Sequence, residues 1–438
     1  MKITIVTSYG TRGDVQPYLA LALRLKEEGH EPTLVAGLEY ASFIRERRIE
    51  YAPMRINVRE ILDSKACKAV FNGAGKEKRD AIKAWRKALS ARLPDMLDDI
   101  WATAREADCL IYPPTLYPVW HIADKLKIPA IISFAVPAVS VTGAFPAPWL
   151  RASDSGRFFN RWTHRAAIMM LTLGFRSIVK AWCRTTLKVK PPSLFKNYLS
   201  RNGAPIPVLY CYSPKVLPMP NDWNDTTLAS GYWFLQREES WKPSPELEDF
   251  LSKGPPPVYF GFGSVPSGDP ERTNCLILSA LRQSGERGII AIGESGMTAQ
   301  QGHEFVHYEQ QICHDWLFSR VKAVAHHGGS GTLAIGLRSG KPTIVCPFTI
   351  EQRFWGNQVN SLNAGPPPLP QLPQQGFTAE ALSEAIKTAV SDPSILKGAE
   401  DLGKEIRNED GLKKAVEFIN AQIDRDKNSR KVLMTITT

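Results

Sequence analysis

Residues 321–337 read VKAVAHHGGSGTLAIGL. The apolar run 321–325 predicts a buried strand, and residues 333–337 open a helical pattern. A strand, a tight glycine-rich turn and a helix start present free backbone N–H groups and the positive end of the helix to an anion. We therefore expect a phosphate or diphosphate site here. The alternative is an ordinary glycine-rich turn with two solvated histidines.

A second polar turn follows the next strand-like run. Residues 342–346 (PTIVC) predict a buried strand, and residues 347–352 (PFTIEQ) come directly after it. In a doubly wound sheet, ligands bind outside the carboxyl ends of the strands. Two such turns in succession favour a ligand site over an isolated structural turn.

Strands and helices alternate along both halves of the chain. Residues 2–8 predict a buried strand, a glycine-rich turn follows at 10–14, a helix runs from about 17 to 28, and residues 31–36 predict the next strand. This βαβ order predicts a parallel sheet. The fold class is therefore α/β, with two Rossmann-like doubly wound domains facing a cleft. Further strands are expected at 109–112, 130–134, 208–212, 258–262, 288–292, 305–308, 321–325 and 343–346.

Length and composition divide the chain. Its 438 residues are too many for one compact core, so two domains of roughly 200 residues each are expected. Residues 1–236 form the expected N-terminal domain and 258–400 the C-terminal domain. The proline-rich segment 237–257 predicts a semi-rigid linker. The charged tail 401–438 is expected to be helical, with fraying over 424–438.

Bulk composition indicates an ordinary globular protein, with 43% hydrophobic and 22% charged residues. The seven cysteines are scattered without a Cys-x-x-Cys pair, which fits a reducing compartment. The start has no signal-peptide pattern, and no run reaches the roughly 18 apolar residues that a membrane span needs. We therefore expect a cytoplasmic protein.

The formal net charge of +10 favours anionic partners, such as nucleotide diphosphates or acidic lipids. Nucleic acid is not expected, because the basic residues are dispersed and no recognition motif is present. A long helical insert is expected at about 154–200. Within it, residues 169–190 combine basic and apolar side chains, which fits either peripheral contact with a membrane or a lid or core helix with a solvated basic side.

Seven segments, taken in order, resemble one family. They match the nucleotide-sugar glycosyltransferases with the two-domain glycosyltransferase-B fold, and within them the sterol 3-β-glucosyltransferase-like branch, which is related to the antibiotic glycosyltransferases. The resemblance covers nearly the whole chain. The segments are 11–17 (TRGDVQP), 207–210 (PVLY), 231–234 (GYWF), 257–264 (PVYFGFGS), 314–318 (HDWLF), 326–332 (HHGGSGT) and 354–356 (FWG).

The resemblance implies a reaction and its base. It implies an inverting transfer of a hexose from a UDP-sugar co-substrate to the hydroxyl of a lipophilic acceptor such as a sterol, a phenol or another hydrophobic natural product, with no cofactor and no metal. Asp14 matches the family's catalytic base, and a carboxylate there can take the proton of the acceptor hydroxyl. The structural alternative is that Asp14 caps the following helix. The resemblance also implies that the last helix crosses back onto the N-terminal domain.

The donor site implied by the resemblance is built around His326, the family's phosphate-binding histidine. Ser264 matches a serine near the same phosphates, although ordinary turn chemistry also explains it. Backbone contacts of Ile312 can read uracil and His314 can bond ribose; UDP is favoured over dTDP by resemblance alone. The full donor set is Gly13, Ser264, Ile312, His314, His326, His327, Gly329, Ser330, Gly331, Thr332, Glu351 and Gln352.

One donor position departs from the family pattern. Glu351 and Gln352 are expected to hydrogen-bond adjacent sugar hydroxyls, but the family usually has Asp-Gln. The longer side chain of Glu351 leaves the identity of the hexose open, with glucose as the default.

The acceptor site is expected in the N-terminal domain, on apolar and aromatic side chains that suit a bulky hydrophobic molecule. Ordinary core packing is the alternative for each of them. The candidates are Phe134, Val136, Phe145, Trp149 and Met170.

Two further hypotheses concern a metal site and a different function. Residues 303–307 (HEFVH) match a zinc motif that requires a helix, but residues 305–308 predict a strand, which would separate the two histidines by roughly 13 Å. No metal is therefore expected. The alternative function is a nucleotide-sugar-binding protein or epimerase of the same architecture, without transfer to an acceptor.

Overall fold

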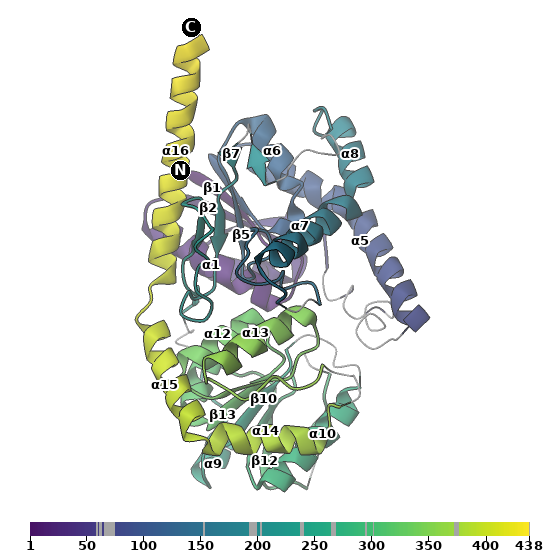
Figure 1. Ribbon diagram of the computed structural model, residues 1–438, viewed down its shortest axis with the longest axis vertical. Helices are drawn as coiled ribbons and strands as arrows, with labels where there is room; N and C mark the ends of the chain where they lie inside the picture. The colour runs from purple at the N-terminus through teal and green to yellow at the C-terminus, as the bar shows by residue number, and fades with distance from the viewer. Residues whose placement is uncertain are drawn as a thin grey trace.

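The computed structural model describes residues 1–57, 60, 64, 75–151, 154–191, 199–201, 204–236, 241–263, 269–293, 296–300, 302–371 and 376–437. Two parallel sheets, each covered by helices, form two domains stacked along the long axis (Figure 1). This is the predicted pair of doubly wound α/β domains.

The N-terminal sheet has seven strands in the order β3-β2-β1-β4-β5-β8-β9, all parallel. Its central strands carry almost only buried side chains, because helices cover both faces. A short antiparallel pair, β6 and β7, lies apart from this sheet. The strands are β1 Lys2–Val6, β2 Glu31–Gly37, β3 Glu50–Met54, β4 Cys109–Tyr112, β5 Ala130–Phe134, β6 Ser200–Arg201, β7 Ala204–Pro205, β8 Val208–Tyr210 and β9 Thr227–Ala229.

The helices of this domain include the predicted insert. It consists of two helices, α7 and α8, which meet at Phe175 with a bend of 51°. No single helix in the described chain passes a length-and-hydropathy test for a membrane span, whereas this bent pair passes it jointly. The helices are α1 Arg12–Glu27, the short η1 Leu38–Tyr40, α2 Ala41–Arg45, α5 Gly75–Ala104, η2 Pro114–Leu116, α6 Val119–Leu126, α7 Arg157–Gly174 and α8 Arg176–Thr185.

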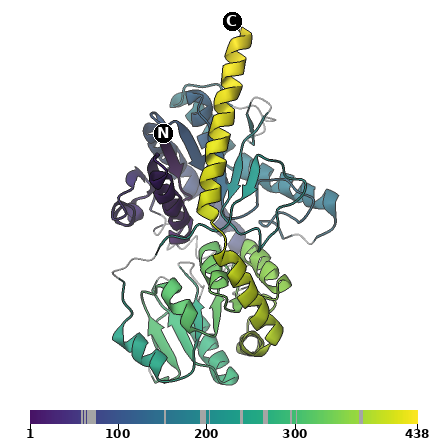
Figure 2. The same cartoon turned by 90° about the vertical axis from the view of Figure 1, so that its left-hand side faces the viewer.

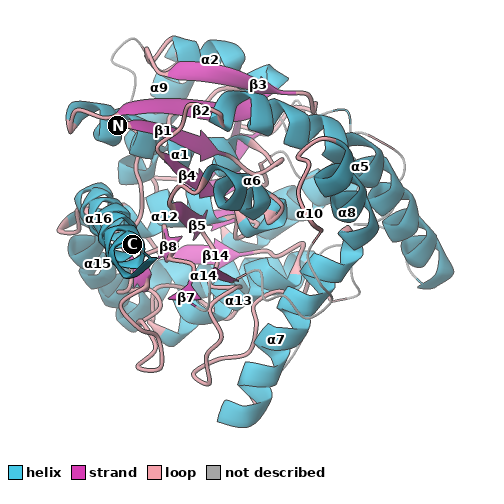
Figure 3. Cartoon of the chain, turned by 90° about the horizontal axis from the view of Figure 1, so that it is seen from above, coloured by secondary structure: helices cyan, strands magenta, loops and turns pink. Residues whose placement is uncertain are grey.

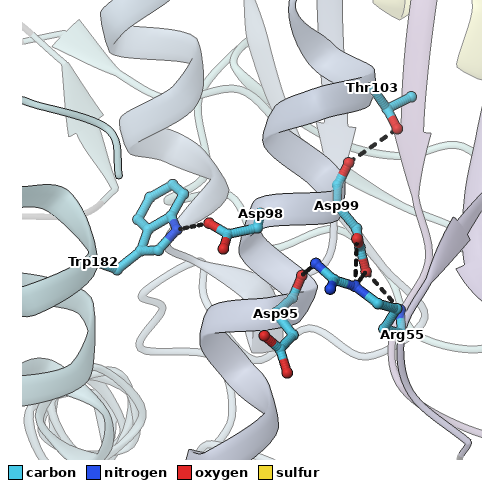
Figure 4. A network of polar contacts seen from close by, with 6 residues as sticks. All are labelled: Arg55, Asp95, Asp98, Asp99, Thr103 and Trp182. Carbon is cyan, nitrogen blue, oxygen red and sulfur yellow. Dashed lines mark hydrogen bonds and ion pairs between the residues drawn. The ribbon is translucent and has the colours of Figure 1, made fainter. Parts of the chain in front are cut away.

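Helix α5 is tied to its neighbours by carboxylates on two of its sides (Figure 4). Asp99 accepts hydrogen bonds from the backbone N–H of Arg55, just after β3, at 2.7 Å and from its Nε at 2.8 Å. Asp98 accepts one from Trp182 Nε1 of α8 at 2.8 Å. These bonds fix α5 between the edge of the sheet and the insert.

The C-terminal sheet has five parallel strands in the order β12-β11-β10-β13-β14. Helix starts follow the expected chemistry; for example, Asp269 accepts from Arg272 N at the start of α10. The strands are β10 Val258–Gly261, β11 Gly288–Ala291, β12 Val306–Glu309, β13 Ala323–His326 and β14 Thr343–Val345. The helices are α9 Pro245–Ser252, α10 Pro270–Ser284, α11 His314–Leu317, η3 Phe318–Arg320, α12 Ser330–Arg338, α13 Ile350–Ser361, α14 Ala379–Ser391 and α15 Pro393–Arg407.

Two boundary predictions need correction. The predicted linker 237–257 contains a helix, α9, whose Leu247 is buried against the C-terminal sheet. The tail is not frayed from residue 424, because α16 runs as one helix from Gly411 to Thr437. Its first half packs on α1, with Ile419 and Ile423 fully buried.

The chain crosses back between the domains at its end. Helix α15 packs on α12 of the C-terminal domain, and α16 then runs along the N-terminal domain, as Figures 1 and 2 show. The crossing point is tight: a Cβ on Gly411 would lie 2.6 Å from the carbonyl carbon of Gly231. Ser213 donates to Glu409 across it at 2.9 Å. Helices α15 and α16 form a strap between the domains. This strap and the domain interface hold the two sheets together.

Candidate functional site

The N-termini of three helices meet between the domains. A Cβ on Gly331 of α12 would lie 3.8 Å from Cα of Gly13 in α1, so these two backbones are in contact. Gly328, with φ +91°, brings the loop before α12 against Gln352 in the first turn of α13. Each helix start contributes partial positive charge and free N–H groups. This junction between the domains therefore suits an anion.

Asp14 lies in the first turn of α1, not in the loop before it as the sequence suggested. Thr11 and Asp14 form a capping box, with Thr11 N donating to Asp14 Oδ2 at 2.9 Å. This pair starts the helix five residues before Pro17, the residue at which the sequence placed the start. The capping role weighed for Asp14 is thus present, but it uses only one of the two carboxylate oxygens.

The surroundings of Asp14 suit a base. Desolvation by the surrounding protein raises the pKa of this carboxyl from 3.8 to about 6, and the hydrogen bond from Thr11 opposes the shift. A general base is most effective when its pKa lies near the working pH. Asp14 is therefore ionised, yet basic enough to take a proton, near neutral pH.

Glu351, in the first turn of α13, lies near enough to Asp14 to respond to its charge. Desolvation and the charge of Asp14 raise its pKa from 4.5 to about 7, while a hydrogen bond from Trp355 Nε1 at 3.2 Å opposes the shift. Two carboxylates at the same place disfavour double ionisation. The charge of Asp14 therefore favours the protonated form of Glu351.

Gln352 is oriented differently from its neighbour. Its Oε1 accepts hydrogen bonds from the backbone N–H of Phe348 at 2.7 Å and of Thr349 at 3.0 Å, within the capping box of α13. The side chain is buried. Only its Nε2 remains to donate to a ligand, so the expected symmetric pair of sugar contacts is reduced to one carboxylate and one amide donor.

His326 presents a buried donor without a partner. It ends β13, and its Nδ1 accepts a hydrogen bond from Gly328 N at 2.9 Å. Burial, followed by the charges of His327 and His314, holds its pKa well below the usual value. The ring is therefore neutral with its proton on Nε2. This Nε2 is buried and has no hydrogen-bond partner among the described residues.

The first turn of α12 completes the anion-binding surface. The N-cap of the helix is Gly329, which has no side chain to satisfy the free amides of the turn. Gly329, Ser330, Gly331 and Thr332 are partly exposed. The turn predicted to bind phosphate is therefore partly open to solvent.

The other donor candidates have mixed placements. His314 Nε2 is bonded to the Tyr259 hydroxyl at 2.8 Å, and burial lowers its pKa to about 4. His327 is buried, and burial lowers its pKa to about 4 against a backbone hydrogen bond with Gly261. Ile312 is partly buried and packs against the hydrophobic cluster that contains Tyr259 of β10. Ser264 lies outside the described residues.

Arg12 is a residue that the sequence reasoning missed. It begins α1 beside Asp14, and its charge helps to lower the pKa of His314 in the other domain. Its guanidinium stacks on Phe43 at 4.5 Å. A cation next to the predicted base was the available signal in the sequence.

The acceptor candidates differ in their surroundings. Phe134 and Trp149 pack edge to face, with ring centroids 5.7 Å apart. Phe145 contacts Phe354 of α13 at 5.8 Å and therefore reaches the donor-side domain. Val136 is buried, as in ordinary core packing. Met170, in contrast, lies on the solvent-exposed side of α7.

The zinc motif lacks the helix that it needs. His307 lies in β12 and is bonded to Glu309 at 3.3 Å, while His303 precedes the strand. Among the described residues, no group of three or more His, Cys, Asp or Glu side chains could hold an ion. All six cysteines in the described part are free.

Comparisons with known proteins agree with this arrangement. Residues 4–141 match the N-terminal domain of glycosyltransferase family 28. The chain superposes on the glycosyltransferase of kitacinnamycin with a TM-score of 0.68 at 18% identity, covering 96% of this chain and 98% of the other. The calicheamicin glycosyltransferase CalG4 gives 0.68 at 15% identity, covering 97% and 98%. These solved structures confirm the glycosyltransferase-B fold.

Sequence relatives extend over nearly the whole chain. A sterol 3-beta-glucosyltransferase of Arabidopsis thaliana is 34% identical over 97% of this chain and 68% of its own length. A second one is 32% identical over 93% and 63%. One from Emericella nidulans is 31% identical over 97% of this chain but only 30% of its own. By the first of these matches, the chain belongs to the sterol 3-beta-glucosyltransferase family of glycosyltransferases.

Proposed function

We propose that this protein transfers glucose from UDP-glucose to the hydroxyl of a sterol or a similar lipophilic alcohol, with inversion at the anomeric carbon and without a metal. Its relatives are sterol 3-beta-glucosyltransferases by name. They do not favour the alternative of a binding protein or epimerase.

One observation carries the proposal: the expected base and the expected phosphate site are adjacent although they come from different domains. Asp14 lies in the first turn of α1, whose Gly13 contacts Gly331 of α12. An acceptor hydroxyl beside Asp14 would face an anomeric carbon whose diphosphate rests on α12. This is the arrangement that a single displacement needs.

The chemistry follows from the same residues. Asp14 takes the hydroxyl proton as the oxygen attacks. Negative charge grows on the departing diphosphate, where the N–H groups of α12 and the unpaired Nε2–H of His326 can meet it. Glu351 and the Nε2 of Gln352 would hold sugar hydroxyls.

Release of UDP tests the proposal. Purified protein is incubated with UDP-glucose in the presence of EDTA, alone and with a sterol, a phenol or a flavonoid. Release that depends on the sterol, together with the appearance of a steryl glucoside, is expected. UDP release without any glycoside, or isomerisation of the sugar nucleotide, would contradict transfer. Loss of activity in EDTA with rescue by a divalent ion would contradict the metal-free mechanism.

A further inference from the structure

Helix α7 has an inverted distribution of polarity. A surface helix of a globular protein normally buries its apolar stripe and exposes its polar face. In α7 the exposed stripe holds Phe158, Trp162, Met169 and Leu173, which are 84, 55, 55 and 48% exposed. Their spacing of four, seven and four residues places them on one side of the helix. Large apolar side chains gathered in this way mark an interaction surface.

The opposite face of α7 is polar, buried and hydrogen-bonded. Asn160 Nδ2 donates to the Gly143 carbonyl at 3.0 Å, and the backbone N–H of Ala147 donates to Thr163 Oγ1 at 2.9 Å. His164 Nε2 is bonded to the Phe145 carbonyl at 3.1 Å. All three bonds go to the loop 143–147. They set the rotation of the helix, so the apolar stripe is held outward.

The chain around α7 carries an excess of positive charge. Residues 155–221 contain no Asp or Glu. Within α7, Arg161 is paired with Asp222 at 2.9 Å, but Arg157 and Arg165 are exposed and have no acidic partner among the described residues. More basic residues follow on and after α8, namely Arg176, Lys180, Arg184, Lys188 and Lys190.

Other parts of the predicted basic region are ordinary core. Leu171, Phe175 and Ile178 pack against the N-terminal core. The bond from Trp182 to Asp98 of α5 fixes α8 to the body of the domain (Figure 4). Helix α7 extends outward from the other elements of that domain when the molecule is viewed from above (Figure 3). The unpaired surface is therefore the outer face of α7.

We propose that this face docks on the surface of a membrane that contains anionic lipid. An exposed aromatic and methionine stripe can enter the boundary between headgroups and acyl chains, while arginines beside it contact lipid phosphates. The charge of Arg157 and Arg165 argues for anionic lipid as the occupant, since a neutral apolar partner would offer these two arginines no counter-charge. The proposal concerns binding alone and does not depend on the identity of the sugar acceptor.

Flotation with vesicles tests the proposal on the full-length protein. Vesicles of phosphatidylcholine alone are compared with an equimolar mixture of phosphatidylcholine and phosphatidylglycerol. The protein is expected to float with the mixed vesicles and to be released by high salt, because surface charge is screened. Equal binding to both vesicles, or none to either, would overturn the proposal. Resistance to alkaline carbonate would also overturn it, because that result indicates a membrane span.

Two variants separate the apolar and the charged contributions. Phe158→Ser/Trp162→Ser/Met169→Ser and Arg157→Glu/Arg165→Glu should each lower binding to mixed vesicles at least about ten-fold. The matched controls are Leu38→Ser and Leu396→Ser for the first, and Lys387→Glu/Lys413→Glu for the second; these exposed positions lie on other elements and should leave binding unchanged.

Circular dichroism and thermal unfolding confirm that each variant is folded before it is scored. Because the stripe is already exposed, its replacement should not lower the Tm. If the α7 variants bind as well as the wild type, or if the controls lose binding equally, the α7 face is not the docking surface. Failure of the proposed glucosyl transfer would leave this result unaffected, since no donor or acceptor is added.

Discussion

At the scale of single residues, Asp14 serves both the fold and the proposed chemistry. One of its oxygens caps α1 through Thr11, and the pKa of the carboxyl is raised to about 6. These roles can be separated by Asn, whose carbonyl can still accept from Thr11 but which cannot take a proton.

The first prediction follows from this separation. Asp14→Asn should lower kcat by about 100-fold or more, because general-base catalysis contributes roughly 10²–10⁴. The Kd for UDP should change little. Asp392→Asn, the same change at the N-cap of α15, is the control and should keep full turnover. Steady-state kinetics on both variants check this. A normal kcat in Asp14→Asn would show that Asp14 only caps α1 and is not the base.

The second prediction concerns the raised pKa of Glu351. Because its folded pKa of about 7 exceeds its ordinary value of 4.5, it stabilises the fold below pH 4.5, and that contribution is lost as the pH rises through 7. Glu351→Gln should therefore raise the Tm of the ligand-free protein at about pH 8, with a gain that shrinks toward pH 4.5. Its amide oxygen can still accept from Trp355.

Differential scanning fluorimetry across this pH range measures the gain. Glu384→Gln, on the exposed side of α14, removes the same charge outside the cleft and serves as the control. A Tm difference for Glu351→Gln that is constant with pH, or that grows toward acid, would show that the pKa of Glu351 is not raised in the folded protein.

The third prediction concerns the unpaired donor of His326. His326→Ala should weaken UDP binding by about 1.5–3 kcal/mol, the range for a hydrogen bond to a charged group. Isothermal titration calorimetry measures this, with His303→Ala outside the cleft as the control. Wild-type affinity in the His326 variant would remove this histidine from the diphosphate site.

At the scale of elements, the crossing of α16 makes the N-terminal domain depend on the end of the chain. Ile419 is fully buried against α1 and the first sheet. Ile419→Ala, the fourth prediction, should lower the free energy of unfolding of this domain by about 2–5 kcal/mol. Urea unfolding followed by tryptophan fluorescence measures the loss. Glu417→Ala, on the exposed side of α16, should be close to neutral, and equal effects of the two changes would contradict the packing.

The elements also show how far sequence reasoning reached. Strands with continuous apolar runs, such as β1 and β10, were predicted within about two residues because burial on both faces leaves a plain pattern. The start of α1 was wrong, since Pro17 suggested a helix start whereas the capping box of Thr11 and Asp14 determines it. The orientation of Gln352 was not predictable, because its bonds to Phe348 and Thr349 depend on how the turn closes.

Tertiary contacts account for the remaining differences. Helix α16 continues to Thr437 through the stretch predicted to fray, and its first half packs on α1, a contact that the local sequence does not predict. The apolar residues of the insert split into core and surface only once Asn160, Thr163 and His164 fix the rotation of α7. The resemblance supplied Asp14 and His326, but the free Nε2–H of His326 emerged only from the geometry.

At the scale of the whole molecule, aromatic contacts join the two domains. Tyr212 of the N-terminal domain contacts Trp355 of α13 with ring centroids 5.6 Å apart, and Phe145 contacts Phe354. The strap through α15 and α16 joins the same two bodies (Figure 2). The proposed base from one domain therefore faces the proposed phosphate site of the other, as a direct displacement requires.

The configuration of the product tests this central claim most directly. Protein supplied with UDP-α-glucose and a sterol is allowed to react, and the anomeric proton of the purified glycoside is read by NMR. Attack by an Asp14-activated hydroxyl on the face opposite the diphosphate predicts a β-glucoside, formed in equal amount with the UDP released. An α-glucoside would contradict the account, because retention of configuration cannot arise from a single displacement across this cleft.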